Sequence, residues 1–340
     1  MNILDLESKE LEGLLTDMGF PKYRAGQIFG WCAKGCTDFD EMKNIPGSMK
    51  DRLRDEEVLA ILPKVTKSQL SKSDGTRKCL MTMEDGRSVE AVFMKYKYGN
   101  SICISSQAGC RMGCRFCASG MNGLERDLTA GEMYGEILAM EKETGEKISH
   151  VVVMGTGEPL DNYDNLVRFI HILNDPKGKN LGMRNITVST CGLVPMIDQF
   201  GDDLPQVNLA ISLHGVTDEE RSAIMPVNNA YPIAELLKAA RSYTEKTGRR
   251  ITFEFTLIKG VNDDDETAHK LAGLLHGMLC HVNLIPLNEV KEKEFKSALR
   301  DRALAFRDIL ESRGIPTTVR RELGSDIDAA CGQLRMSSNQ

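Results

Sequence analysis

The chain has 340 residues, of which 41% are hydrophobic and 27% are charged, and its formal net charge is −6 at pH 7. This ordinary globular composition suits one large core plus a small domain, and the apolar runs are too short to cross a membrane. The acidic residues 1–15 lack the apolar segment of a signal peptide. We therefore expect a cytoplasmic protein whose ten cysteines serve metal binding or catalysis and do not form a disulfide framework.

Residues 1–63 predict a small all-helical domain. Leucines recur at helical spacing over the first 18 residues, and Gly19 marks the end of that helix. Residues 23–33 show a second helical pattern, and residues 46–54 show a third that begins with proline in its first turn. Short helices separated by tight turns are typical of a compact accessory domain.

Residues 64–98 change to strand patterns and form one basic segment in an acidic chain. They carry eight basic and four acidic side chains, although the net charge of the whole chain does not indicate a nucleic-acid partner. Asp74-Gly75 and Asp85-Gly86 are hairpin signals flanked by alternating sequence. Glu90 interrupts an otherwise apolar strand, so its carboxylate either faces solvent, which the spacing favours slightly, or is buried for a function.

A loop rich in glycine and small residues, 105–118, follows a short strand that contains Cys103. The loop holds Cys110, Cys114 and Cys117 in a C-x-x-x-C-x-x-C spacing. Three such thiolates can bind three irons of a four-iron, four-sulfur cluster and leave the fourth iron open. Structural cysteines or three of four zinc ligands are the alternatives. Zinc sites usually add a second C-x-x-C or a histidine pair, and the sequence has no second C-x-x-C and no H-x-x-x-H, so we favour the cluster.

Beyond the loop the sequence alternates between strand and helix patterns. The predicted strands are 150–154, 185–189, 207–212, 251–258 and 281–287, with helices near 129–144, 161–173, 192–200, 231–246, 264–276 and 298–313. Alternation of this kind implies a parallel sheet covered by helices. A full eight-unit barrel needs about 250 residues, so the pattern predicts a partial (β/α)6 barrel that stays open.

Unusual residues follow four of these strands, at the ends where barrel enzymes have their active sites. They are Gly157 and Glu158 in a glycine-rich turn, Ser189, the run Ser212, Leu213 and His214, and Asn288. Each alone would more often be a turn, a helix cap or a core histidine. Because they converge with the cysteine loop, we interpret them as one site. The turn is not a phosphate loop, since no Gly-Lys-Ser/Thr follows it.

The C-terminal residues 323–340 are too polar and irregular to close a core. Cys331 lies there between small residues, and Gly332 allows a tight loop. A cysteine in such a tail is more often inert than reactive. On its own this feature does not indicate a function.

Together these motifs resemble those of the radical S-adenosylmethionine (SAM) methyltransferases that modify adenosine in large-subunit ribosomal RNA, of the RlmN type. The resemblance covers nearly the whole chain, and its motifs are 94–96, the spacing from Cys103 to Cys110, 155–160, 212–214 and 330–332. The sister enzyme Cfr methylates another carbon of the same adenosine. The Gly-Thr-Gly-Glu-Pro turn and residues 287–289 look like RlmN and not Cfr.

The resemblance implies methylation of carbon 2 of an adenosine in 23S rRNA, and in some members also of tRNA, by a cytoplasmic enzyme. It implies one [4Fe-4S] cluster, two SAM molecules per turnover, a flavodoxin-type or other electron donor, and a monomer. The expected organisation is a helical RNA-binding domain (1–63), a basic hairpin segment (64–98), a radical SAM partial barrel (99–322) and a tail with a catalytic cysteine (323–340). The two N-terminal parts would then grip RNA, chiefly through phosphates, and the target base would be flipped out of its stack.

The resemblance also assigns roles to residues. Cys331 would carry the methyl group, Cys103 would resolve the reaction and form a disulfide with Cys331, and Glu90 would accept a proton. The cluster ligands would be Cys110, Cys114 and Cys117. The SAM-contacting residues would be Gly157, Glu158, Ser189, Ser212, Leu213, His214 and Asn288.

Three alternatives remain open. The first is Cfr-like methylation of carbon 8. The second is a radical SAM enzyme with a different substrate, which would not need Cys103 or the Cys331 tail. The third is a non-enzymatic metal-containing RNA-binding protein, which would not need polar residues at four strand ends.

Overall fold

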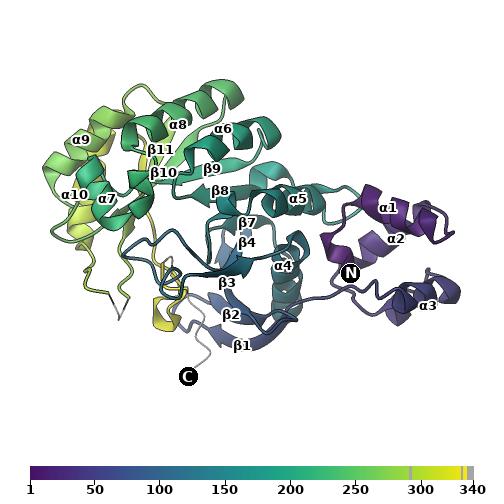
Figure 1. The fold of residues 1–340 in the computed structure, drawn as a ribbon. Helices are drawn as coiled ribbons and strands as arrows, with labels where there is room; N and C mark the ends of the chain where they lie inside the picture. Colours follow the sequence, from purple (N-terminus) through teal and green to yellow (C-terminus); the bar gives the residue numbers. More distant parts are fainter. Residues whose placement is uncertain (291–292, 331, 335–340) are drawn as a thin grey trace.

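The fold was analysed in a computed structural model, which describes residues 1–290, 293–330 and 332–334. Its main feature is a ten-stranded sheet in the order β1-β2-β3-β4-β7-β8-β9-β10-β11-β12 (Figure 1). Seven of these strands are mutually parallel: β4 (Gly99–Ile104), β7 (His150–Val153), β8 (Ile186–Thr190), β9 (Asn208–Ser212), β10 (Ile251–Leu257), β11 (Cys280–Pro286) and β12 (Thr317–Val319). The predicted partial barrel is confirmed. It is open, because β1 and β12 lie at opposite ends of the strand order.

Helices connect the parallel strands. They are α4 (Ala130–Thr144), α5 (Tyr163–Asn174), α6 (Val194–Asp203), α7 (Asp218–Ile224), α8 (Ile233–Thr247), α9 (Asp265–Leu275) and α10 (Arg300–Ser312). A capping box begins α4, since the Thr129 hydroxyl accepts the Glu132 N–H and the Glu132 carboxylate accepts the Thr129 N–H. The central strands β9 and β10 are largely buried, because helices cover one face of the sheet and the barrel interior lies on the other.

The basic segment extends the barrel sheet. Strands β1 (Lys64–Leu70), β2 (Arg77–Thr82) and β3 (Ser88–Tyr96) form antiparallel hairpins at the two predicted Asp-Gly turns, and β3 pairs with β4. A separate hairpin, β5 (Gln107–Gly109) with β6 (Leu124–Asp127), encloses the cysteine loop. Gly109 is required there: it has φ +80°, and a Cβ would lie 2.0 Å from the Gly123 carbonyl oxygen.

The N-terminal helices are α1 (Ser8–Asp17), α2 (Tyr23–Cys32) and α3 (Gly47–Asp55), and α1 lies beside α5 (Figure 1). Asp5 attaches them, because its carboxylate accepts the N–H of Gly131 at 2.6 Å in the first turn of α4. Within the described residues, no helix has both the length and the hydrophobicity needed to span a bilayer.

Candidate active site

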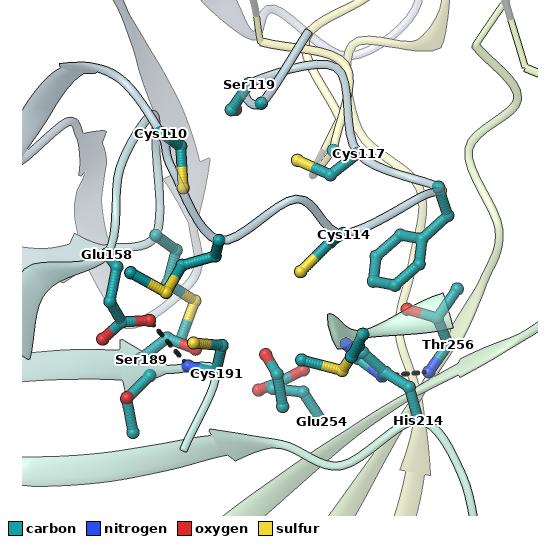
Figure 2. A pocket seen from close by; sticks show the side chains of 18 of the residues that line it. Cys110, Cys114, Cys117, Ser119, Glu158, Ser189, Cys191, His214, Glu254 and Thr256 are labelled. Atoms are coloured by element: carbon teal, nitrogen blue, oxygen red, sulfur yellow. Dashed lines mark hydrogen bonds between the residues drawn. The ribbon is translucent and has the colours of Figure 1, made fainter. Parts of the chain in front are cut away.

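A pocket lies at the carboxyl ends of the parallel strands, as predicted for this fold. Figure 2 shows the cysteine loop on one side of it and side chains from the strand ends on the other. The predicted site residues that line it are Cys110, Cys114, Cys117, Gly157, Glu158, Ser189, Ser212, His214 and Asn288. Leu213 is fully buried and is not among the lining residues.

Backbone hydrogen bonds position the cysteine loop. The Cys110 N–H donates to the Gly123 carbonyl at 2.9 Å, and the Arg115 N–H donates to the carbonyl of Ile224, the last residue of α7, at 2.9 Å. The Ala118 N–H donates to the Gly332 carbonyl at 2.8 Å, which joins the loop to the C-terminal tail. The loop is therefore tied to β6, to α7 and to the tail.

The chemistry of the three thiols suits a multi-iron cluster. Burial, together with the neighbouring thiols and Glu158, raises the pKa of Cys110 to about 11 and raises that of Cys114 further. These groups therefore need nearby positive charge to be thiolates, and iron ions supply such charge. No three His, Cys, Asp or Glu side chains of the described residues are arranged to hold a single metal ion. The thiols line a pocket instead, which fits an iron–sulfur cluster better than zinc.

Glu158 links the glycine-rich turn to the end of β8. One of its carboxylate oxygens accepts the Cys191 N–H at 2.7 Å, and the other accepts the Leu160 N–H at 3.1 Å. Burial raises the pKa of this carboxyl group, while these hydrogen bonds act in the opposite direction. Gly157 allows the turn to approach the start of the cysteine loop, since its φ is +109° and a Cβ would lie 2.7 Å from the Ser106 hydroxyl.

His214 is neutral and has a defined tautomer. The Thr256 N–H donates to its Nδ1 at 2.9 Å, so the ring proton is on Nε2. Burial, and then the nearby charge of Arg221, lower the pKa of His214 to about 3. The edge of the ring contacts Phe116 of the cysteine loop, with ring centroids 5.0 Å apart. The backbone of His214 is left-handed, with φ +57°, which is uncommon outside glycine.

Arg221 holds two strand ends together and was not identified from the sequence. Its side chain is fully buried, and the guanidinium donates to the carbonyls of Cys191 after β8 and of Ser212 and Leu213 at the end of β9. The side-chain oxygen of Asn228 accepts a fourth hydrogen bond.

The carboxylate of Glu254, in the middle of β10, was also not identified from the sequence. It lines the pocket, and burial raises its pKa.

A second pocket adjoins the first and shares Asn288 and Arg320 with it. Cys103 lines this pocket, as do tail residues Ala329, Ala330 and Leu334. Among the described residues every cysteine is a free thiol. Cys331, the predicted methyl carrier and disulfide partner, lies outside the described residues.

Glu90 corrects one expectation from the sequence. The spacing favoured an outward carboxylate, and this was wrong: Glu90 is 4% exposed and forms an ion pair with Lys78 at 3.2 Å. Lys78 is buried as well. In the register of β2, β3 and β4, Val92 lies opposite both Lys78 and Cys103, so Lys78, Glu90 and Cys103 share one face of the sheet.

The chain is similar to known proteins over nearly its whole length. A model of the radical SAM superfamily matches residues 104–272, and a model of the ribosomal RNA large subunit methyltransferase N-terminal domain matches residues 1–59. The chain is 53% identical to a probable dual-specificity RNA methyltransferase RlmN of Clostridium perfringens (strain SM101 / Type A), over 99% of this chain and 97% of that protein. It is 50% identical to the protein of the same name in Thermoanaerobacter sp. (strain X514), over 98% and 97%.

A solved structure is similar over the same extent. A radical SAM methyltransferase from Sphaerobacter thermophilus has a TM-score of 0.94 and 45% identity, covering 98% of this chain and 99% of that one. The likeness thus includes the helical N-terminal residues, the barrel and nearly the whole C-terminal part. The chain belongs to the RlmN family of radical SAM RNA methyltransferases.

Proposed function

We propose that this protein methylates carbon 2 of one adenosine in 23S rRNA, and of an adenosine in tRNA as a second substrate, with the methyl group carried on Cys331. The observation that carries the proposal is the pair of adjoining pockets. One is lined by the three loop cysteines, by Cys191 and by polar strand ends, and the other by Cys103 and the tail. The first suits a cluster with SAM, and the second suits a flipped base. The relatives are named dual-specificity RNA methyltransferases, which supports RNA as the substrate and supports more than one kind of RNA.

In the first pocket, Cys110, Cys114 and Cys117 hold the [4Fe-4S] cluster. The residues that contact SAM are Gly157, Glu158, Ser189, Ser212, Leu213, His214 and Asn288. Bound there, the cluster and SAM supply the radical chemistry that an electrophilic amidine carbon requires, because such a carbon does not attack a methyl donor directly. Arg221 and Glu158 keep the strand ends in place through backbone hydrogen bonds. His214 contributes a neutral side chain at physiological pH.

The thiolate of Cys331, which lies outside the described residues, accepts and presents the methyl group. The Cys103 thiolate then attacks the sulfur of Cys331, which carries the RNA through the former methyl carbon. The Cys103–Cys331 disulfide forms as the bond from the Cys331 sulfur to that carbon breaks, and the carbon takes up a proton to become the methyl group of the released RNA. Glu90 takes up the proton lost from the adenine, and its buried ion pair with Lys78 holds the side chain in place. Glu90 lies two residues from Val92, the residue paired with Cys103, so the two proposed groups are neighbours on one face of the sheet.

The remaining assignments concern RNA binding and the supply of electrons. We assign RNA binding to residues 1–63 and to the basic segment 64–98, where phosphate contacts would provide most of the affinity. The protein would act as a cytoplasmic monomer supplied with electrons by a flavodoxin-type or other donor. Residues 99–322 would form the catalytic barrel, and residues 323–340 would form the tail that carries the methyl group.

The identity of the methylated carbon tests this proposal. Purified protein would be incubated anaerobically with SAM, a reductant and unmodified 23S rRNA or tRNA, and the nucleosides would be analysed by mass spectrometry against standards. We expect 2-methyladenosine from both RNAs. Formation of 8-methyladenosine would support the Cfr-like alternative, and SAM cleavage without any RNA product would favour a different substrate.

A further inference from the structure

The turn between β1 and β2 binds the C-terminal tail at several points. The Gly324 N–H donates to the Asp74 carboxylate at 2.9 Å, and the Asp326 carboxylate accepts the Lys72 N–H at 2.9 Å. Gly324 packs closely against this turn, since a Cβ on it would lie 3.0 Å from the Thr76 methyl carbon. These partners are about 250 residues apart in the chain, so the tail returns to the basic segment, and Figure 1 shows it beside β1–β3.

Lys78 connects this docked tail to Glu90. Its ammonium group donates to the Asp328 carbonyl at 3.0 Å and lies 3.2 Å from a carboxylate oxygen of Glu90. The Lys78 and Glu90 side chains are only 8% and 5% exposed. A buried ammonium needs both a counter-charge and hydrogen-bond acceptors, and here the tail backbone provides one of those acceptors. If the tail left this position, the buried Lys78 ammonium would lose the Asp328 carbonyl as a hydrogen-bond acceptor.

We propose that Lys78, together with the β1–β2 turn, is the positioning site for the carrier tail, and that its ammonium group joins the docked tail to Glu90. The inference rests on the proposed roles of Cys331 and Glu90. It changes the interpretation of part of the basic segment. Lys78 does not belong to a solvated or RNA-facing surface but holds the backbone three residues before Cys331, while the Asp74 and Asp326 contacts fix the preceding turn.

The test uses the full-length holoenzyme with SAM and makes four measurements: the exchange rate of the tail amides, kcat and KM for SAM in Cys331 methylation, and the iron content. Hydrogen exchange with mass spectrometry reports the tail amides of residues 322–330, and mass spectrometry of the C-terminal peptide reports methyl transfer to Cys331. Lys78→Met keeps a similar side-chain length but removes the charge and the donors. Lys72→Met is the matched control, because the Lys72 side chain is exposed and only its backbone N–H contacts the tail.

We expect Lys78→Met to raise the exchange rate of the tail amides at least tenfold and to lower kcat for Cys331 methylation at least tenfold. KM for SAM and the iron content should be unchanged, since none of the residues proposed to hold the cluster or SAM is altered. Lys72→Met should match the wild type in all four measurements. Asp326→Ala removes an exposed tail anchor without touching the buried pair, and it should also accelerate exchange. It therefore keeps the test decisive if Lys78→Met fails to fold.

Two results would overturn the inference. The first is normal tail exchange in both Lys78→Met and Asp326→Ala. The second is faster exchange with an unchanged rate of Cys331 methylation, which would make the contacts merely structural. Cys331→Ala separates the inference from the proposed function, since it should keep wild-type tail exchange at residues 322–330. If Cys331→Ala still methylated RNA, the carrier role would fail while the docking site stood.

Discussion

His214 should make the folded protein less stable in acid by an amount that follows from its environment. Its pKa is lowered from 6.5 to about 3, chiefly by burial. The unfolded chain therefore binds this proton at a higher pH than the folded protein does. The stabilisation is complete above pH 6.5 and is lost as the pH falls toward 3. At 1.36 kcal/mol per pKa unit, this residue alone should lower the free energy of unfolding by about 2.5 kcal/mol between pH 7 and pH 4.5.

His214→Asn isolates this contribution. The asparagine oxygen can accept the Thr256 N–H in place of Nδ1, asparagine tolerates the left-handed backbone at this position, and it does not titrate. Urea unfolding would be compared at both pH values, with cluster-free protein because acid releases the iron. Between pH 7 and pH 4.5, the free energy of unfolding should fall by about 2.5 kcal/mol more in the wild type than in the variant. If the free energy of unfolding depended on pH identically in the two proteins, His214 would not have the lowered pKa on which this prediction rests.

Two further predictions concern the cluster and the RNA. Replacing any one of Cys110, Cys114 or Cys117 by Ala should abolish the broad visible absorbance after anaerobic reconstitution and the formation of 5′-deoxyadenosine, because two thiolates should not hold a four-iron cluster. A protein lacking all three cysteines that still bound four irons would contradict this. Lys95→Glu with Lys97→Glu should weaken RNA binding and lower the slope of log affinity against log salt by about 1–2. An unchanged slope would make the basic segment a solvated surface. The fold should persist, because the Lys95–Glu146 ion pair is exposed and such pairs contribute about 1 kcal/mol or less.

Patterns with a local cause were predictable from the sequence. The strand that became β7 is recognisable from its three consecutive valines, which are buried on one face of the strand and half-buried on the other. The cysteine loop is recognisable because thiol spacing directly reflects cluster geometry. The candidate site followed from one rule of the fold, that the carboxyl ends of parallel strands meet at one edge. Glu158, Ser189 and His214 could thus be grouped before any contact between them was known.

Features that depend on distant partners were not predictable. The outward assignment of Glu90 failed because its counter-charge, Lys78, lies on a neighbouring strand and meets it only in the observed register. Arg221 follows acidic residues in a short helix, a context typical of a solvated surface, and its burial depends on the Cys191 carbonyl 30 residues away. The docking of Asp326 on the turn before β2 spans 254 residues. No local signal in the sequence marks such contacts.

In the proposed mechanism Cys331 carries the methyl group and Cys103 releases the product, and Cys103→Ala separates these two roles. Purified anaerobically after reaction with SAM, reductant and RNA, this variant should be recovered with RNA covalently linked through Cys331, because the group that releases the product is missing. The double variant Cys103→Ala/Cys331→Ala should yield no adduct, and Cys331→Ala alone should neither accept a methyl group nor become linked to RNA. Mass spectrometry of the nuclease-treated C-terminal peptide would identify the linkage. A Cys103→Ala protein that methylates RNA at the wild-type rate, with no RNA attached, would contradict the account.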